Sequence, residues 1–183
     1  MINKILLGKT SFNLKKQILF SKLSGDINPI HIDSIEARKS IAGECIVHGM
    51  HSFLWSIEHL INEIKYSFSS YEINFKRYIP LNLKVYCFWD PVKKKLTIEK
   101  KEGIVFLIVK CCGEINNKKD WLPVNNKDIL KRPIINDLSK FKKDYKVSSV
   151  YGGEIEISKL LFPKLLSQVG ENLIYEISII SNI

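Results

Sequence analysis

The spacing of apolar positions predicts two helices near the N-terminus, the second of them long. From position 48 to Ile64 apolar residues recur at steps of three and four, with Glu58, Asn62 and Glu63 on the other side. This spacing is typical of a helix, and the apolar stripe is wide enough for the helix to be nearly surrounded. A shorter amphipathic helix is expected over 14–23, ending at Gly25. Residues 1–13 alternate weakly, which favours an edge strand and a turn.

Four stretches rich in β-branched and aromatic residues follow the long helix, at 71–75, 83–89, 96–101 and 104–114. Pro80, Asp90-Pro91 and Glu102-Gly103 separate them, and the last pair is a hairpin signal. A long helix followed by an antiparallel meander indicates an α+β fold with the sheet wrapped on the helix. Between the two helices we expect an ordered loop over 25–33 and a short helix over 34–40, capped by Asp33 or Ser34.

The chain changes character after Glu114. A polar stretch with little periodicity reaches about Tyr145 and is interpreted as a linker. The closing stretch fits an interrupted helix around Pro163, with Gly170 as a stop. The apolar ending at 177–183 is unusual for a free terminus. Either this tail docks on the body of the protein or the chain is part of a longer one.

Composition narrows the class of protein. The chain has 183 residues, of which 45% are apolar and 26% charged, as in a folded globular protein. No apolar run approaches the ~20 residues of a spanning helix, and the N-terminus lacks the features of a secretory signal. We therefore expect a cytoplasmic protein. The four cysteines have no framework spacing, so free thiols are expected.

The net charge of +9 could in principle favour nucleic acid, anionic lipid or a phosphorylated small molecule. The lysines are spread along the whole chain, however, and no nucleic-acid-binding motif accompanies them. We therefore expect neither nucleic acid nor a membrane as a partner.

The residues with the clearest chemistry lie on the loop after the first helix and at the start of the long one. Asp26 and His31 are five positions apart on one loop and could converge on a single water molecule, one taking its proton and the other handling a proton on the hydroxyl. Asn28 could fix the loop or hold the water, and Pro29 limits the freedom of the loop. Gly49 lies at a helix N-terminus, where unpaired amide groups favour a developing enolate oxygen.

Several motifs in this region follow one another in the order of a known family. They are Ser-Gly-Asp26-x-Asn-Pro-x-His31-x-Asp, Ala37-Arg38, Ile-Val-His48-Gly-Met, and Phe75-x-x-Tyr-Ile-Pro80. Over residues 1–115 the sequence thereby resembles the MaoC-like dehydratases, the (R)-specific enoyl-CoA hydratase branch of the hotdog fold. The resemblance does not extend to residues 116–183.

The resemblance implies a function for these residues. Asp26 and His31 become the catalytic pair, Asn28 their support and the Gly49 amide the oxyanion donor. The implied enzyme is a hydro-lyase that reversibly hydrates trans-2-enoyl thioesters of coenzyme A or a carrier protein to the (R)-3-hydroxyacyl form, with no metal and no redox cofactor. A hotdog domain is expected over 1–118, pairing with a second hotdog either as a homodimer or within a double-hotdog chain. Residues 119–183 are expected to be a linker and a C-terminal extension that could begin a second, incomplete unit.

Two other functions stay open. The domain could be a catalytically silent hotdog module that binds an acyl group or stabilises a partner. It could also be a hotdog thioesterase, although the acidic residue this needs on the central helix is not obvious, because Glu58 and Glu63 lie beyond its first turns.

Other residues near the motifs have less specific interpretations. We expect His48 to pack and cap the helix rather than act in catalysis, and we do not expect zinc at Cys45, His48 and His51 because a fourth ligand is missing. Arg38 could be a surface cation or a clamp on a carboxylate. The family mostly has an apolar residue at the position of His51 and often proline at that of Cys45. Three further cations could meet coenzyme A phosphates or simply be the solvated side of the sheet: Lys76, Arg77 and Lys84.

Overall fold

In the computed structural model, residues 4–64, 67–101, 103–115 and 157–165 are described. Their elements form an α+β fold in which β1 comes first and the other four strands follow the central helix. The helices are α1 (Leu14–Ser24), α2 (Pro29–Ile32), α3 (Ser34–Ala37), α4 (Gly49–Glu63) and α6 (Ser158–Leu161). The strands are β1 (Ile5–Ser11), β2 (Ser67–Phe75), β3 (Lys84–Asp90), β4 (Lys95–Glu99) and β5 (Val105–Ile115).

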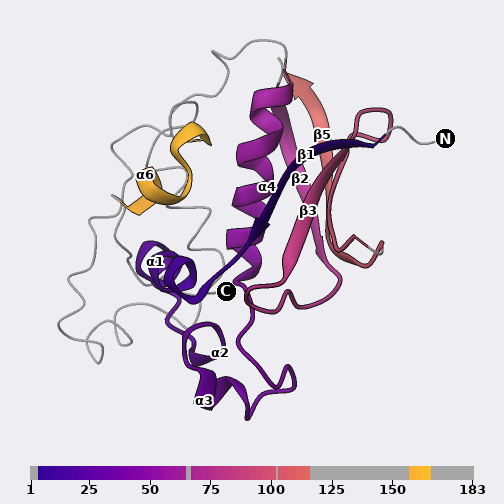
Figure 1. Ribbon diagram of the computed structural model, residues 1–183. Helices are drawn as coiled ribbons and strands as arrows, with labels where there is room; N and C mark the ends of the chain where they lie inside the picture. Colours follow the sequence, from indigo (N-terminus) through magenta and orange to yellow (C-terminus); the bar gives the residue numbers. More distant parts are fainter. Residues whose placement is uncertain (1–3, 65–66, 102, 116–156, 166–183) are drawn as a thin grey trace, which may run out of the picture.

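The strands form one antiparallel sheet of five in the order β1-β3-β4-β5-β2. Figure 1 shows the sheet on one side of α4, and α1 and α6 on the other. This arrangement confirms the hotdog fold. The meander is confirmed only for β3, β4 and β5, because β2 pairs with β5 rather than with β3, its neighbour in sequence. As a result β1 and β2 are the two edges of the sheet.

Turn residues end the strands where the sequence indicated. The Asp90 carboxylate accepts hydrogen bonds from the amides of Val92 and Lys93, which closes the turn between β3 and β4. Gly103 has a φ of 82° in the hairpin between β4 and β5, a conformation that glycine adopts without strain. These two turns set the register that directs Val85, Cys87 and Trp89 to the core.

The central helix is enclosed on nearly all sides, as its wide apolar stripe predicts. Its buried residues lie around the whole circumference rather than along one stripe. They comprise Met50, His51, Ser52, Phe53, Leu54, Ser56, Ile57, Glu58 and Leu60. Burying a side chain such as Leu54 stabilises the fold by about 1.5–3 kcal/mol. The layers on both sides of α4 therefore contribute to the stability of the domain.

The helix α1 is defined by caps that the sequence carries. The Asn13 side chain accepts from the Lys16 amide at its start, and Gly25, with a φ of 77°, donates its N–H to the Ser21 carbonyl at its end. The loop expected over 25–33 is in part helical, because Asn28 caps and Pro29 begins the short helix α2. The short helix expected over 34–40 is confirmed but ends at Ala37.

The described part of the C-terminal region packs on the outer side of α4. Phe162 is fully buried, with its ring edge-on to those of Phe20 and His51. The Glu58 carboxylate accepts hydrogen bonds of 3.0 Å from the amides of Lys164 and Leu165. Helical turns on both sides of Pro163 confirm the interrupted helix there. The expected linker, the stop at Gly170, the apolar ending and the second hotdog unit lie outside the described residues, so the boundary at 118 stays a prediction.

Replacing Glu58 by Gln is expected to lower the free energy of unfolding by about 1–3 kcal/mol, because one of the two backbone donors then faces an amide NH₂ group. Urea unfolding of the full chain measures the loss. Glu63→Gln, an exposed position on the same helix, is the matched control and should change the value by less than about 0.5 kcal/mol. Equal effects of the two substitutions would contradict the anchoring role of Glu58.

Candidate active site

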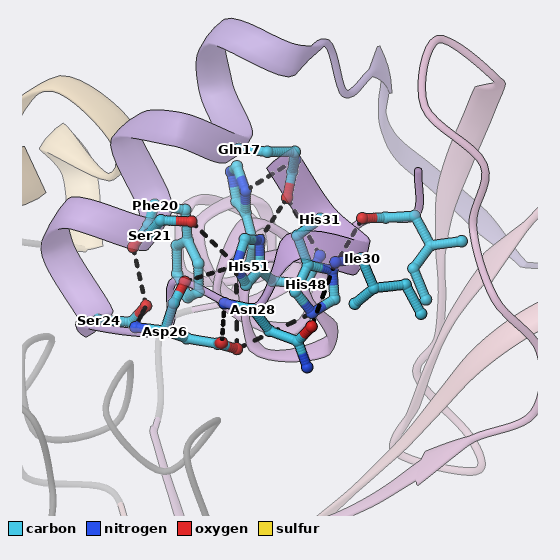
Figure 2. Close-up of polar contacts among 11 residues, drawn as sticks. Gln17, Phe20, Ser21, Ser24, Asp26, Asn28, Ile30, His31, His48 and His51 are labelled. Carbon is cyan, nitrogen blue, oxygen red and sulfur yellow. Dashed lines mark hydrogen bonds and ion pairs between the residues drawn. The ribbon is translucent and has the colours of Figure 1, made fainter. Parts of the chain in front are cut away.

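The structure brings Asp26 and His31 together. The Asp26 Oδ2 atom lies 3.8 Å from His31 Nε2, and both side chains are mostly buried. The second carboxylate oxygen, Oδ1, accepts from the Asn28 amide at 3.1 Å, which leaves Oδ2 toward the histidine. Figure 2 shows this loop with the carboxylate and the rings close to one another. The predicted convergence of an acid and an imidazole on one loop is thus present.

Asn28 supports the loop rather than facing the carboxylate with its own side chain. Its side-chain oxygen accepts from the Ile30 amide at 3.2 Å and caps α2. Through its backbone amide it also fixes Asp26. Of the two uses that the sequence left open for Asn28, fixing the loop is the one that its contacts fit.

His31 has a defined tautomer. Its Nδ1 lies 2.9 Å from the Ile46 carbonyl oxygen, which can only accept, so Nδ1 carries a proton. In the neutral ring Nε2 is then an acceptor, and this is the atom nearest to Asp26 Oδ2. The ring therefore presents a basic nitrogen beside the carboxylate.

His48 is a third member of this cluster, although the sequence predicted for it only a structural role at the start of the helix. The fully buried His48 stacks on His31, with ring centroids 3.8 Å apart, and its Nε2 lies 3.9 Å from Asp26 Oδ2. His48 is the N-terminal cap residue of α4 and is fully buried, which confirms the predicted packing at the helix entrance, although its side chain makes no capping hydrogen bond. The signal in the sequence was its place immediately before Gly49 in the His-Gly motif.

Gly49 begins α4, so its N–H has no acceptor within the helix. A Cβ at this position would lie 2.9 Å from Cε1 of Phe75, so a larger residue here would require the exposed Phe75 ring to move. Gly49 and His31 both line one cavity of about 230 Å³, whose other walls are mainly apolar. Asp26 is not among its lining residues, so His31 is the group that links the carboxylate to the cavity. The cavity is lined by His31, Ile46, Val47, Gly49, Ser52, Phe75, Arg77, Tyr78, Ile79, Phe106 and Leu107.

Burial keeps two histidines neutral. Desolvation lowers the pKa of His48 to about 2, helped by the nearby His31, and lowers the pKa of His51 to about 3. His51, where the family mostly has an apolar residue, stacks on Phe20 and pairs with Gln17 instead of facing the cavity. It belongs to the support of the site.

These two buried rings are expected to make the protein less stable in mild acid. An unfolded histidine binds a proton below about pH 6.5, whereas the folded rings stay neutral to about pH 3 and 2. Below pH 6.5 the unfolded state thus holds more protons, so the free energy of unfolding falls with pH, approaching about 1.4 kcal/mol per unit for each ring. Urea unfolding between pH 7 and 4.5 measures this slope. His51→Leu should reduce it by one ring's share, and an unchanged slope would contradict the assignment.

Three residues could hold a metal ion among those that the structure describes. One ligand atom each from Asp26, His31 and His48 lies within 4.8 Å of the others. The two rings are stacked with only 27° between their planes. Planes so arranged do not meet at a point about 2 Å beyond both Nε2 atoms, where a shared ion would have to lie. Metal binding would thus require one ring to turn. The set Cys45, His48 and His51 is not one of the clusters within the described ranges.

Cys45 and Glu58 are two groups that a thioesterase could use, and neither is placed for hydrolysis. Burial, followed by the charges of Asp33 and Glu44, raises the pKa of the Cys45 thiol. Glu58 is committed to the backbone amides of Lys164 and Leu165. The acidic residue that a thioesterase needs on the helix is therefore not supplied by Glu58.

The sequence model of the MaoC-like domain family matches residues 9–109. A monoamine oxidase regulatory protein from Archaeoglobus is 18% identical, with 62% of this chain and 88% of that chain covered at a TM-score of 0.51. A MaoC-like dehydratase from Rhodospirillum rubrum is 10% identical, with coverage of 62% and 90% and a TM-score of 0.50. An (R)-hydratase from A. caviae involved in PHA biosynthesis is 21% identical, with coverage of 60% and 94% and a TM-score of 0.47.

At these identities the solved structures support the fold and nothing finer. A search of curated proteins finds no match. Among the described residues, no helix has the length and apolar character to cross a membrane.

Proposed function

Because the chain belongs to the MaoC-like domain family, we propose that it is a hydratase that adds water to 2-enoyl thioesters and, in the reverse direction, dehydrates (R)-3-hydroxyacyl thioesters. The substrate is an acyl group on coenzyme A or a carrier protein, and the reaction uses the side chains of the protein without a cofactor.

The observation that supports the proposal is that two hydrogen-bond acceptors, His31 Nε2 and Asp26 Oδ2, lie close together. In its neutral form His31 presents Nε2 as an acceptor to Asp26 Oδ2 at 3.8 Å, a separation too long for a direct hydrogen bond. A water molecule has two O–H donors and would satisfy both groups at once. The hydroxyl group of a 3-hydroxyacyl thioester is chemically similar to that water. The pair therefore fits the oxygen that is added or removed in the reaction.

The proposed reaction balances with water and the enoyl thioester alone. The water oxygen forms a bond to C3 while one of its protons passes to the Asp26–His31 pair. The π electrons of the enoyl group move onto the thioester oxygen, which gives an enolate. The pair then returns the proton to C2 on the same face, which restores the carbonyl group. The net change is addition of H and OH, and the enzyme ends in its starting state.

The Gly49 amide is placed to stabilise that enolate. It lies at the positive end of the α4 dipole and lines the same cavity as His31. A backbone donor aimed at a developing oxyanion contributes about 3 kcal/mol in comparable sites. The apolar remainder of the cavity suits a short acyl chain, while the exposed Arg77 at the cavity wall suits an anionic part of the substrate.

We also propose that the protein is a homodimer. In the described sheet, β1 and β2 are edges, and a second copy could continue the sheet at one of them. Sedimentation of the full chain at several concentrations tests this, and a monomer throughout would contradict it.

The proposed activity is tested with trans-2-enoyl-CoA thioesters of three to eight carbons beyond the carbonyl. Loss of the enoyl absorbance with formation of the (R)-3-hydroxyacyl product supports the hydratase. A thiol-trapping dye in a parallel sample reports hydrolysis, and its reaction without hydroxyacyl product would identify a thioesterase. Binding of the thioesters with neither product would identify the silent module, and each of these last two results overturns the proposal.

A further inference from the structure

A buried amide lies behind the acid and the imidazole of the site. Gln17 of α1 is fully buried, and its Oε1 atom lies 2.8 Å from His48 Nδ1 and 3.1 Å from the His48 backbone nitrogen. Its Nε2 atom lies 3.2 Å from Nδ1 of His51. Figure 2 shows the Gln17 side chain reaching both rings from α1. The reaction steps above give no role to the Gln17 side chain or to its contacts with His48 and His51.

The contacts with Gln17 favour a proton on Nδ1 of His48. A backbone N–H can only donate, so the atom of Gln17 that faces it is the carbonyl oxygen and not the amide nitrogen. The same oxygen must then accept from His48 Nδ1, which therefore carries a hydrogen. Because burial keeps the ring neutral, Nε2 is left with a lone pair.

The Nε2 atom of His48 is the part of the ring that faces the site. The Ser21 hydroxyl lies 3.2 Å away and can donate to it. The backbone oxygen of Asp26 is 3.2 Å away and Oδ2 of Asp26 is 3.9 Å away. The carbonyl can only accept and would favour a proton on Nε2, but the contact between Nδ1 and the Gln17 oxygen is shorter, at 2.8 Å, and favours a proton on Nδ1. In the opposite tautomer, an N–H at this position would be directed at the oxygens of Asp26.

We propose that Gln17 is a positioning residue: by accepting a hydrogen bond from Nδ1 of His48, it holds His48 in the tautomer with an unprotonated Nε2 and so leaves the Asp26 carboxylate free to take a proton from water. The statement about the tautomer is independent of the reaction. The statement about Asp26 rests on the proposed hydratase function.

A donor at Nε2 of His48 would hinder the reaction in a specific way. A hydrogen bond to a carboxylate favours its charged form and weakens it as a base. The His48 ring also covers one face of His31 at 3.8 Å, so its protonation state acts on both members of the pair. The other titratable groups near His48 are His51, on the same helix, and Lys16, which faces His51 from α1.

The tautomer is measured directly in the full chain labelled with ¹⁵N-histidine, by two-bond correlations between ring protons and ring nitrogens at pH 7. We expect Nδ1 of His48 to be protonated and Nε2 to be unprotonated. A spectrum of the wild-type protein with a proton on Nε2 of His48 overturns the inference, whatever the activity of the protein. In Gln17→Leu we expect the Nε2–H form to appear, because Asp26 then offers the nearest acceptor.

The effect on Asp26 is measured by the pH dependence of kcat/KM. In Gln17→Leu we expect the plateau to fall by about tenfold to 10²-fold and the acidic limb to move to lower pH. KM should change little, since Gln17 does not line the cavity. Leu23→Val, a buried position on the same helix, should lower stability and leave the acidic limb in place.

The outcomes separate the two proposals. An acidic limb that stays in place in Gln17→Leu, with the tautomer changed, overturns the role of Gln17 toward Asp26 and leaves the hydratase function standing. A wild-type protein that hydrates no thioester overturns the hydratase function and with it the statement about Asp26, while the labelled spectrum still decides the tautomer.

Discussion

Replacing Asp26 by Asn, or His31 by Ala, is expected to lower kcat/KM for hydration by about 10² to 10⁴-fold. Each substitution removes one of the two acceptors that lie 3.8 Å apart and that would hold the water. Stopped assays of hydroxyacyl product measure the loss. Asp26→Asn keeps the oxygen that accepts from the Asn28 amide, so the loop should keep its conformation.

The matched control is Asp33→Asn, an exposed acidic residue of the same region that caps α3 through the amides of Ile35 and Glu36. It should lower stability slightly, because asparagine is also a good cap, and should leave the rate within about threefold. If Asp26→Asn and His31→Ala retain the wild-type rate in folded protein, both are excluded as the catalytic pair.

The second large effect concerns the amide of Gly49, which only proline removes. Proline suits the first position of a helix, and the preceding residue, His48, already has the φ of −57° and ψ of 130° that a residue before proline prefers. The ring atoms of a proline at position 49 would need the space that Phe75 occupies. The test is therefore made in a Phe75→Ala background, where Gly49→Pro is expected to lower kcat by about 10² to 10³-fold relative to Gly49→Ala.

The comparison between these two double variants isolates the N–H group. Both fill the space beside position 75, and only the alanine variant keeps the amide proton. Circular dichroism and urea unfolding should give similar values for the two proteins. Equal kcat values would show that the Gly49 amide does not stabilise the enolate.

The sequence was informative where local rules decide the outcome. The caps at Asn13 and Gly25, the turns at Asp90 and Gly103 and the stripe of α4 all depend on neighbours a few positions away. The closeness of Asp26 and His31 also follows from a short loop whose ends are fixed. For these features, pattern and structure agree because no distant contact competes with the local preference.

Features that depend on distant partners could not be read from the pattern. The pairing of β2 with β5 rather than β3 is decided by how the sheet closes around α4. The sequence predicted a loop over 25–33, but the segment from Pro29 to Ile32 is helical. Asn28 caps this helix with its side chain and binds Asp26 with its backbone amide. His48 was assigned to packing because nothing local indicates that its ring meets His31, and the role of Gln17 requires its contact with a residue 31 positions away.

The use of Glu58 to bind the amides of Lys164 and Leu165 has a consequence for how this protein can change. The two segments are 106 positions apart in the chain, yet the acidic residue is favourable only while its distant partners remain. In a variant without residues 157–165, leucine or methionine at position 58 should make the protein more stable than glutamate does. In a chain that keeps these residues, the same substitution should lower the stability. We therefore expect positions 58 and 162–165 to vary together among related chains.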